Sequence, residues 1–97
     1  MVAYRVSVPP HVATVVVHLP PAIKQDIKAA LRILSTDPHA GEPLQRELQG
    51  LWKYRARSFR IVCQIAHERR LIRVMAVGHR KTIYDVVLQP HRPPSPP

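Results

Sequence analysis

The chain has 97 residues, enough for one domain with a modest core. No apolar run reaches the roughly 18 to 20 residues that cross a bilayer, and Pro9 and Pro10 interrupt any N-terminal signal pattern. The single cysteine, Cys63, excludes an internal disulfide. We therefore expect a cytoplasmic protein without a membrane partner.

The positive charge is concentrated in the second half of the chain. The formal net charge is +9; residues 1–50 carry five Lys/Arg against four Asp/Glu, and residues 51–97 carry ten against two. A one-sided positive field favours a polyanionic partner, either nucleic acid or an acidic protein. A membrane surface is disfavoured, because no basic amphipathic helix is evident.

The first half of the chain predicts one strand and two helices. Residues 3–8 alternate as a strand does, and the proline pair ends it. Residues 11–19 are rich in β-branched residues, but their apolar spacing and the preceding prolines favour a helix. Residues 20–38 give the clearest helix, which begins at a proline pair and ends at Asp37-Pro38. Its apolar stripe is Ile23, Ile27, Leu31 and Leu34, with Ala30 beside it.

Three closely spaced strands follow a connector at residues 38–50, in which Leu44 and Leu48 are expected to contact the core. The predicted strands are residues 52–57, 59–66 and 71–78, with a hairpin turn at residues 67–70. The third is nearly all apolar and should be an interior strand. Residues 79–88 suit a strand extension or a short helix, and the proline-rich residues 90–97 a disordered tail.

This order of elements predicts an α+β domain spanning residues 1–89. Strands joined by short turns imply a mainly antiparallel sheet. The two early helices should pack on one face of it. The other face, here called the distal face, would have no helix to cover it.

Alternation along the strands assigns the basic residues of the segment "WKYRARSFR" to the distal face. Lys53, Arg55 and Arg57 share one side of their strand, and Trp52, Tyr54 and Ala56 the other. In the next strand an apolar set faces the helices: Phe59, Ile61, Cys63 and Ile65. Arg60 then joins Lys53 and Arg55 on the distal face.

A basic face with a phenol suits phosphodiester chemistry on RNA. Arg80 and Tyr84 follow the third strand of this series closely. Arginine binds phosphate oxygens in a planar fork and stays cationic. RNA supplies its own nucleophile, the 2′-OH, so no metal is needed. Neighbouring cations favour phenolate, so Tyr84 is a candidate base, with His79 as an alternative that alternation places opposite Arg80.

The other residues of the chain offer no stronger alternative chemistry. The histidines lack metal-ligand spacing and glycine is too sparse for a phosphate loop, so we expect neither metal nor cofactor. Cys63 lies on the apolar side of its predicted strand, so we expect a buried structural thiol rather than a nucleophile. Trp52 reads as a packing residue rather than a base-stacking platform. Composition and spacing leave open whether the basic face is catalytic or only binds an acidic partner.

Four segments together resemble the RelE/ParE superfamily of toxins over residues 3–88. They are "YRV" near the start, "LPPAIKQDI", "LQRELQGLWKYRARSFRIVCQI" and "VMAVGHRKTIY". The resemblance implies a β-α-α-β-β-β fold with a short C-terminal element. It also implies a type II toxin–antitoxin pair, whose RelB-like antitoxin has an acidic C-terminal segment and contacts operator DNA, to which the toxin binds only indirectly.

RelE-type members cleave mRNA in the ribosomal A site, without metal, by 2′-OH attack. Carried over by position, the resemblance implies catalytic roles for Lys53, Arg55, Arg60, Arg80 and Tyr84. The expected RNA-binding residues are Lys53, Arg55, Arg57, Arg60, His79 and Lys81. The resemblance assigns no role to Arg57, which is expected as a general RNA or antitoxin contact. Ribosome, mRNA and antitoxin are then the expected partners.

This chain also departs from the RelE pattern. The hairpin before Arg60 is shorter, Tyr84 follows Arg80 more closely, and Arg55 replaces a common lysine. ParE-type members share the fold and instead poison DNA gyrase, generally without the full basic-plus-tyrosine set. The retained set favours a ribonuclease; a gyrase poison and a non-catalytic antitoxin-binding remnant are the alternatives.

Overall fold

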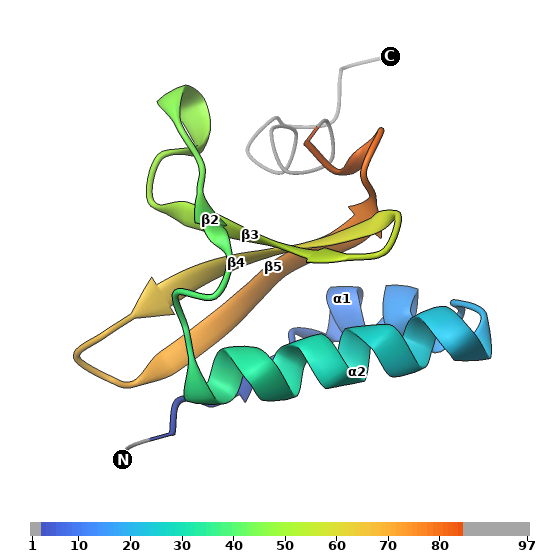
Figure 1. The fold of residues 1–97 in the computed structure, drawn as a ribbon, viewed down its shortest axis with the longest axis horizontal. Coiled ribbons are helices and arrows are strands. Elements are labelled where there is room, and N and C mark those ends of the chain that lie inside the picture. The colour runs from blue at the N-terminus through green and yellow to red at the C-terminus, as the bar shows by residue number, and fades with distance from the viewer. Residues whose placement is uncertain (1–2, 85–97) are drawn as a thin grey trace.

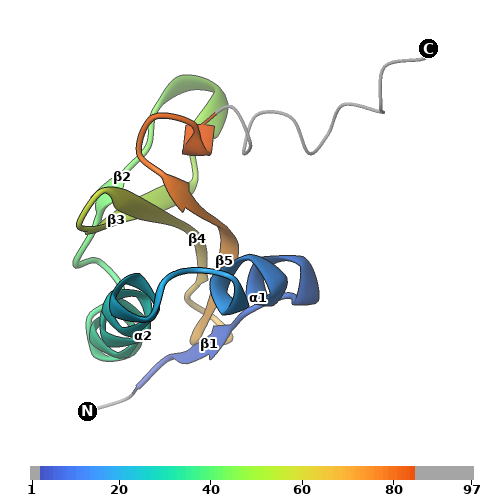
Figure 2. The same ribbon diagram turned by 90° about the vertical axis from the view of Figure 1, so that its right-hand side faces the viewer.

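Two helices cover one face of a five-stranded sheet in the computed structural model, which describes residues 3–84 (Figures 1 and 2). The first half contains β1 (Arg5–Ser7), α1 (Pro10–Val17) and α2 (Pro21–Thr36). The second contains β2 (Glu42–Pro43), the 3-10 helix η1 (Arg46–Leu48), β3 (Leu51–Ala56), β4 (Phe59–Ala66) and β5 (Leu71–His79). The predicted α+β order is therefore confirmed, with β2 and η1 added inside the expected connector.

The strand order is β1-β5-β4-β3-β2. All neighbouring pairs are antiparallel except β1 and β5, which pair in parallel from Arg5 opposite Leu71 to Ser7 opposite Arg73. The mainly antiparallel sheet was predicted, whereas the parallel edge pair was not. It arises because two helices intervene between β1 and the hairpins, and this length of chain permits a crossover.

The main core lies between the helices and the sheet. The predicted stripe of α2 supplies Ile27, Ala30 and Leu34, each at most 3% exposed, and α1 supplies Val12. These side chains pack against Ile61 and Cys63 of β4, among others. The helix predicted over residues 11–19 from their apolar spacing is therefore confirmed as α1. Burial of one face stabilises this helix despite its high content of valine.

A second, smaller apolar cluster occupies part of the distal face. Val62 and Ile83 are fully buried there and Ala76 nearly so; Leu44, Leu48, Leu51, Met75 and Tyr84 pack against them. The expectation of an uncovered distal face was thus wrong in part. Residues 44–48 and 83–84 cover its middle, which confirms that Leu44 and Leu48 contact a core.

A β-bulge in β5 determines which of its apolar residues face each of the two clusters. Val62 pairs with Ala76 but Cys63 pairs with Val74, so Met75 is an extra residue. Met75 and Ala76 therefore both face the second cluster, while Val74 and Val77 face the main core. The bulge also places Gly78 opposite Arg60.

Gly78 makes room for the segment that follows β5. A Cβ at this position would lie 3.0 Å from Cδ1 of Ile83, which packs over it. Residues 80–82 form a turn and residues 83–84 are helical. The predicted domain end at residue 89 and the tail at residues 90–97 lie outside the described residues. No helix within residues 3–84 has the length and apolar character to span a membrane.

Candidate phosphate-binding site

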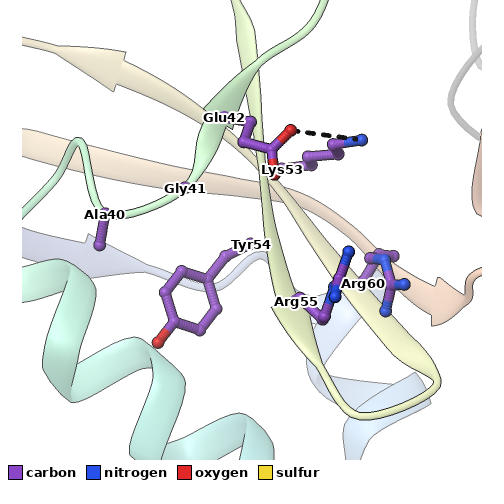
Figure 3. Close-up of a pocket in the computed structure, with 7 residues that line it drawn as sticks. All are labelled: Ala40, Gly41, Glu42, Lys53, Tyr54, Arg55 and Arg60. Carbon is purple, nitrogen blue, oxygen red and sulfur yellow. Dashed lines mark ion pairs between the residues drawn. The ribbon is translucent and has the colours of Figure 1, made fainter.

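Three cationic side chains converge at the outer part of the β3–β4 hairpin. Lys53 and Arg55 come from alternate positions of β3, and Arg60 lies directly opposite Arg55 on β4. Together with residues of the connector they line a pocket of about 240 Å³. Figure 3 labels its seven lining residues: Ala40, Gly41, Glu42, Lys53, Tyr54, Arg55 and Arg60. We call this feature the basic pocket.

The guanidinium of Arg60 is anchored to the hairpin turn. Its Nη1 donates to the carbonyl oxygen of Arg57 at 2.7 Å and to that of Phe59 at 2.8 Å. One nitrogen is thus used for positioning. Since a guanidinium carries five N–H donors, the others remain for an anion.

One carboxylate enters the basic pocket. Oε2 of Glu42 lies 3.9 Å from Nζ of Lys53, and the two side chains are 71% and 34% exposed (Figure 3). An exposed pair at this distance contributes little to stability. Its effect is electrostatic instead, because Glu42 partly neutralises a pocket that otherwise holds three cations.

Gly41 allows the connector to approach β3 closely. A Cβ on Gly41 would lie 2.0 Å from the backbone oxygen of Lys53, a distance that no real side chain tolerates. The contact holds Glu42 in register opposite Lys53 in the two-residue pairing of β2 with β3. Sequence reasoning missed both residues, because Gly41-Glu42 in a loop-like connector gives no signal of strand pairing.

Arg80 and Tyr84 do not line the basic pocket. Arg80 is exposed in the turn after β5, and its backbone N–H donates to the Ser58 carbonyl oxygen at 2.8 Å. Tyr84 is half-buried against the second apolar cluster. Backbone pairing thus brings Arg80 to the same hairpin turn that anchors Arg60. The catalytic roles of Arg80 and Tyr84 stay predictions.

His79 and Lys81 lie beside this turn. The His79 ring packs edge-on against Phe59, with centroids 5.8 Å apart, on the side of the sheet that faces the helices. Its Nδ1 accepts from the backbone N–H of Lys81 at 3.2 Å. His79 therefore lies next to Phe59 and does not line the basic pocket. RNA contacts by His79 and Lys81 remain predictions.

Arg57 does not share the distal face with Lys53 and Arg55. The strand β3 ends at Ala56, and Arg57 begins the turn with a φ of 57°. Its Nε lies 2.6 Å from Oδ2 of Asp26 on α2. The strand-face prediction for Arg57 was wrong because the turn reverses the direction of its side chain. A contact between Arg57 and RNA remains a prediction.

The other residues considered as sites have packing roles. Tyr54 packs on the main core, and Trp52 contacts His39 edge-on with centroids 4.9 Å apart. Burial raises the pKa of the Cys63 thiol to about 12, so it is no nucleophile near neutral pH. Within residues 3–84 no group of three or more His, Cys, Asp or Glu is placed to hold a metal ion.

Solved structures similar to this chain are toxins and toxin–antitoxin complexes. The RelBE2 complex from Mycobacterium tuberculosis contains a chain with 32% identity and a TM-score of 0.74; the alignment covers 82% of this chain and 94% of that one. The E. coli toxin RelE, as a mutant in the free state, has 21% identity, coverage of 89% and 90%, and a TM-score of 0.71. These similarities place the fold among toxins of the RelE/ParE superfamily.

A YoeB/ParE toxin from Agrobacterium tumefaciens shares the fold at 17% identity, with a TM-score of 0.69 and coverage of 77% and 96%. A comparison with curated protein sequences finds no match. The family model for the ParE toxin of type II toxin–antitoxin systems matches residues 4–84. The chain belongs to this family, and the resemblance inferred from its sequence is confirmed.

Proposed function

We propose that this toxin is a metal-independent endoribonuclease that cleaves mRNA in the ribosomal A site and is neutralised by a cognate antitoxin. The observation that carries the proposal is the convergence of Lys53, Arg55 and Arg60 in one pocket. Two guanidinium groups and an ammonium suit a phosphodiester whose charge grows during the reaction.

The reaction follows from the chemistry of RNA. The 2′-oxygen attacks the adjacent phosphorus, the bond from phosphorus to O5′ breaks, and the products are a 2′,3′-cyclic phosphate and a 5′-OH. Arg55 and Arg60 would hold the phosphate oxygens in this step. A lysine ammonium, unlike a guanidinium, can give up a proton. Lys53 is therefore the pocket residue suited to protonating the leaving O5′.

Arg80 and Tyr84 enter the proposal through the resemblance of the sequence. Tyr84 would accept the proton of the 2′-OH, and Arg80 would stabilise the transition state. Placement of Arg80 next to Ser58 supports this assignment, because the turn at residues 57–58 adjoins Arg60. Tyr84 would have to present its hydroxyl from the second apolar cluster toward the basic pocket.

The proposed partners follow from charge. An antitoxin with an acidic segment would compete with RNA for the basic pocket, and the RelBE2 similarity supports pairing with a RelB-like protein. Inhibition of translation during a stress response would be the biological consequence of this cleavage.

Mapping mRNA 5′ ends on ribosomes after expression tests the proposal. We expect new ends in the A-site codon for the wild-type toxin. Arg60→Ala should lower cleavage by about 100-fold, the usual cost of losing one transition-state donor. Combining Arg80→Ala with Tyr84→Phe should abolish it. Full cleavage by this double variant would refute the roles of Arg80 and Tyr84, and absence of new ends for the wild type would refute the ribonuclease.

The ParE family match favours a second candidate function, poisoning of DNA gyrase. It predicts DNA breaks and SOS induction with intact mRNA. Measuring both readouts after expression of the same chain separates the two activities. A chain that causes neither, and no growth arrest, would be a non-catalytic antitoxin-binding protein.

A further inference from the structure

The turn between β3 and β4 contains an arginine where the backbone favours glycine or asparagine. Arg57 has a φ of 57° at the first position of this two-residue turn. Side chains with a Cβ rarely adopt this conformation. Because the backbone conformation does not favour arginine at this position, we examine the contacts that its side chain makes.

The Arg57 side chain reaches the helix layer and contacts a buried oxygen. Its Nε is 2.6 Å from Oδ2 of Asp26, an atom without solvent access or a directed hydrogen bond. The contact is thus an ion pair rather than an aligned hydrogen bond. The Arg57 side chain is 68% exposed, so the pair adds little to stability. It is a direct contact between the turn and α2.

The backbone of the same turn holds the arginines of the candidate site. The carbonyl oxygen of Arg57 accepts from Nη1 of Arg60 at 2.7 Å. The carbonyl oxygen of Ser58 accepts from the backbone N–H of Arg80 at 2.8 Å. A continuous series of contacts therefore runs from Asp26 through Arg57 to Arg60. Ser58, the residue after Arg57, connects the same turn to Arg80 through the hydrogen bond from the Arg80 backbone N–H.

We propose that Asp26 and Arg57 are positioning residues: their ion pair fixes the hairpin turn so that its carbonyl oxygens hold the Arg60 guanidinium in the basic pocket. Neither residue lines the pocket itself. The consequence for RNA cleavage rests on the proposed function, whereas the consequence for Arg60 order is independent of it.

Four single variants isolate the ion pair. Asp26→Asn removes the anion, and Arg57→Asn removes the cation while tolerating the positive φ. Asp37→Asn removes an exposed carboxylate at the end of the same helix. Arg70→Asn removes an arginine that also has a positive φ, of 50°, in the β4–β5 turn. Within residues 3–84 Arg70 forms no ion pair. The last two are the matched controls.

The first measurement needs no activity. Rotation of the Arg60 guanidinium about its Nε–Cζ bond is slowed by hydrogen bonds to carbonyl oxygens and can be followed by NMR. We expect slow rotation in the wild type and both controls, and faster rotation in Asp26→Asn and Arg57→Asn. Equal rotation rates in all five proteins would overturn the proposal.

The second measurement is RNA cleavage. Asp26→Asn and Arg57→Asn should each lower kcat by about 10-fold, as loss of a group that orients an active-site residue does. KM should be nearly unchanged in Asp26→Asn, whereas a rise in KM in Arg57→Asn would report the predicted contact of Arg57 with RNA. Their double variant should be no worse than either single one, because both remove the same contact. The charge-swapped variant, Asp26→Arg with Arg57→Asp, should recover part of the loss.

The outcomes separate the two proposals. If the wild type cleaves no RNA but Arg60 responds to Asp26→Asn, the proposed function fails and the positioning role stands. If the wild type cleaves RNA and both variants retain its kcat, the positioning role fails. A loss of kcat in Asp37→Asn or Arg70→Asn as large as in their counterparts would also overturn it, because charge alone would then explain the effect.

Discussion

Arg55 and Arg60 occupy directly opposed positions on β3 and β4. Like charges facing each other across an antiparallel pair destabilise a sheet, by a fraction of a kcal/mol up to about 1 kcal/mol. The fold therefore retains an unfavourable pair at the mouth of the basic pocket. Binding of an anion between them would remove the repulsion, which links the cost in stability to the proposed phosphate site.

Replacing one of these arginines should stabilise the protein. We expect Arg55→Thr to raise the free energy of unfolding by about 0.5 kcal/mol at low salt. The gain should shrink in about 1 M salt, where the Debye length is about 3 Å. Urea denaturation at both salt concentrations measures it. Arg69→Thr, in the exposed β4–β5 turn, is the control and should have no effect. A loss of stability in Arg55→Thr would contradict the prediction.

Removing the carboxylate of Glu42 should strengthen RNA binding. Glu42→Gln frees Lys53 from its partner at 3.9 Å. A surface pair of this kind corresponds to at most about 1 kcal/mol, or about fivefold in affinity. Titration of a non-cleavable RNA oligonucleotide, with 2′-deoxy substitution at the cleavage site, measures the change. Glu47→Gln, outside the pocket in η1, controls for net charge. Equal gains in both variants would show that Glu42 has no local role.

Adding a methyl group at Gly41 should disrupt the pocket. The new Cβ would lie 2.0 Å from the backbone oxygen of Lys53, so β2 has to move away from β3. Overpacking of this kind costs typically about 1–3 kcal/mol. Gly50→Ala is the comparison: its Cβ meets nothing within 4 Å, although its φ of 96° makes it strained too. Both variants should lower the urea midpoint, but only Gly41→Ala should also weaken oligonucleotide binding.

The buried thiol of Cys63 should make stability fall at high pH. Its pKa rises to about 12 in the folded chain, from about 8.5 for an exposed thiol. Between these values the unfolded chain loses its thiol proton and the folded chain keeps it, so folding becomes less favourable as pH rises. The maximum slope from this group is about 1.4 kcal/mol per pH unit.

Denaturation of the wild type and Cys63→Ala at increasing pH isolates this contribution. The free energy of unfolding should fall more steeply above about pH 9 in the wild type. Iodoacetamide at pH 8 should modify Cys63 only in urea. Rapid alkylation of the folded protein would show that the thiol is accessible, in conflict with its 2% exposure.

Local periodicity predicted most of the fold. The stripe of α2 and the alternation of β4 identified the core side chains, because burial of one face is the main determinant of both patterns. The same alternation placed Lys53, Arg55 and Arg60 together. It failed at Arg57, where the turn begins one residue earlier than the apolar pattern indicated.

Features that depend on distant contacts were not predictable from local pattern. The pairing of β2 with β3 requires only two residues and a close approach at Gly41. The bulge at Met75 cannot be predicted from the sequence, because β5 is apolar on both faces and a shift in its alternation does not change the pattern. The second cluster also uses Ile83, which lies beyond the last predicted strand. The pairing of β2 with β3 contributes to the lining of the basic pocket, and the second cluster places Tyr84.

The pairing of β1 with β5 has a consequence for synthesis of the chain. Within residues 3–84 the strand synthesised last, β5, lies between β1 and the β3–β4 hairpin. While the chain emerges from a translating ribosome, β1 and α1 lack their main contacts with the sheet until β5 is complete. Non-local pairing of this kind is slow to form. A nascent chain cut short before residue 71 lacks that central strand. The core is therefore complete only after β5 has been synthesised, and products that end before residue 71 should be unfolded and harmless.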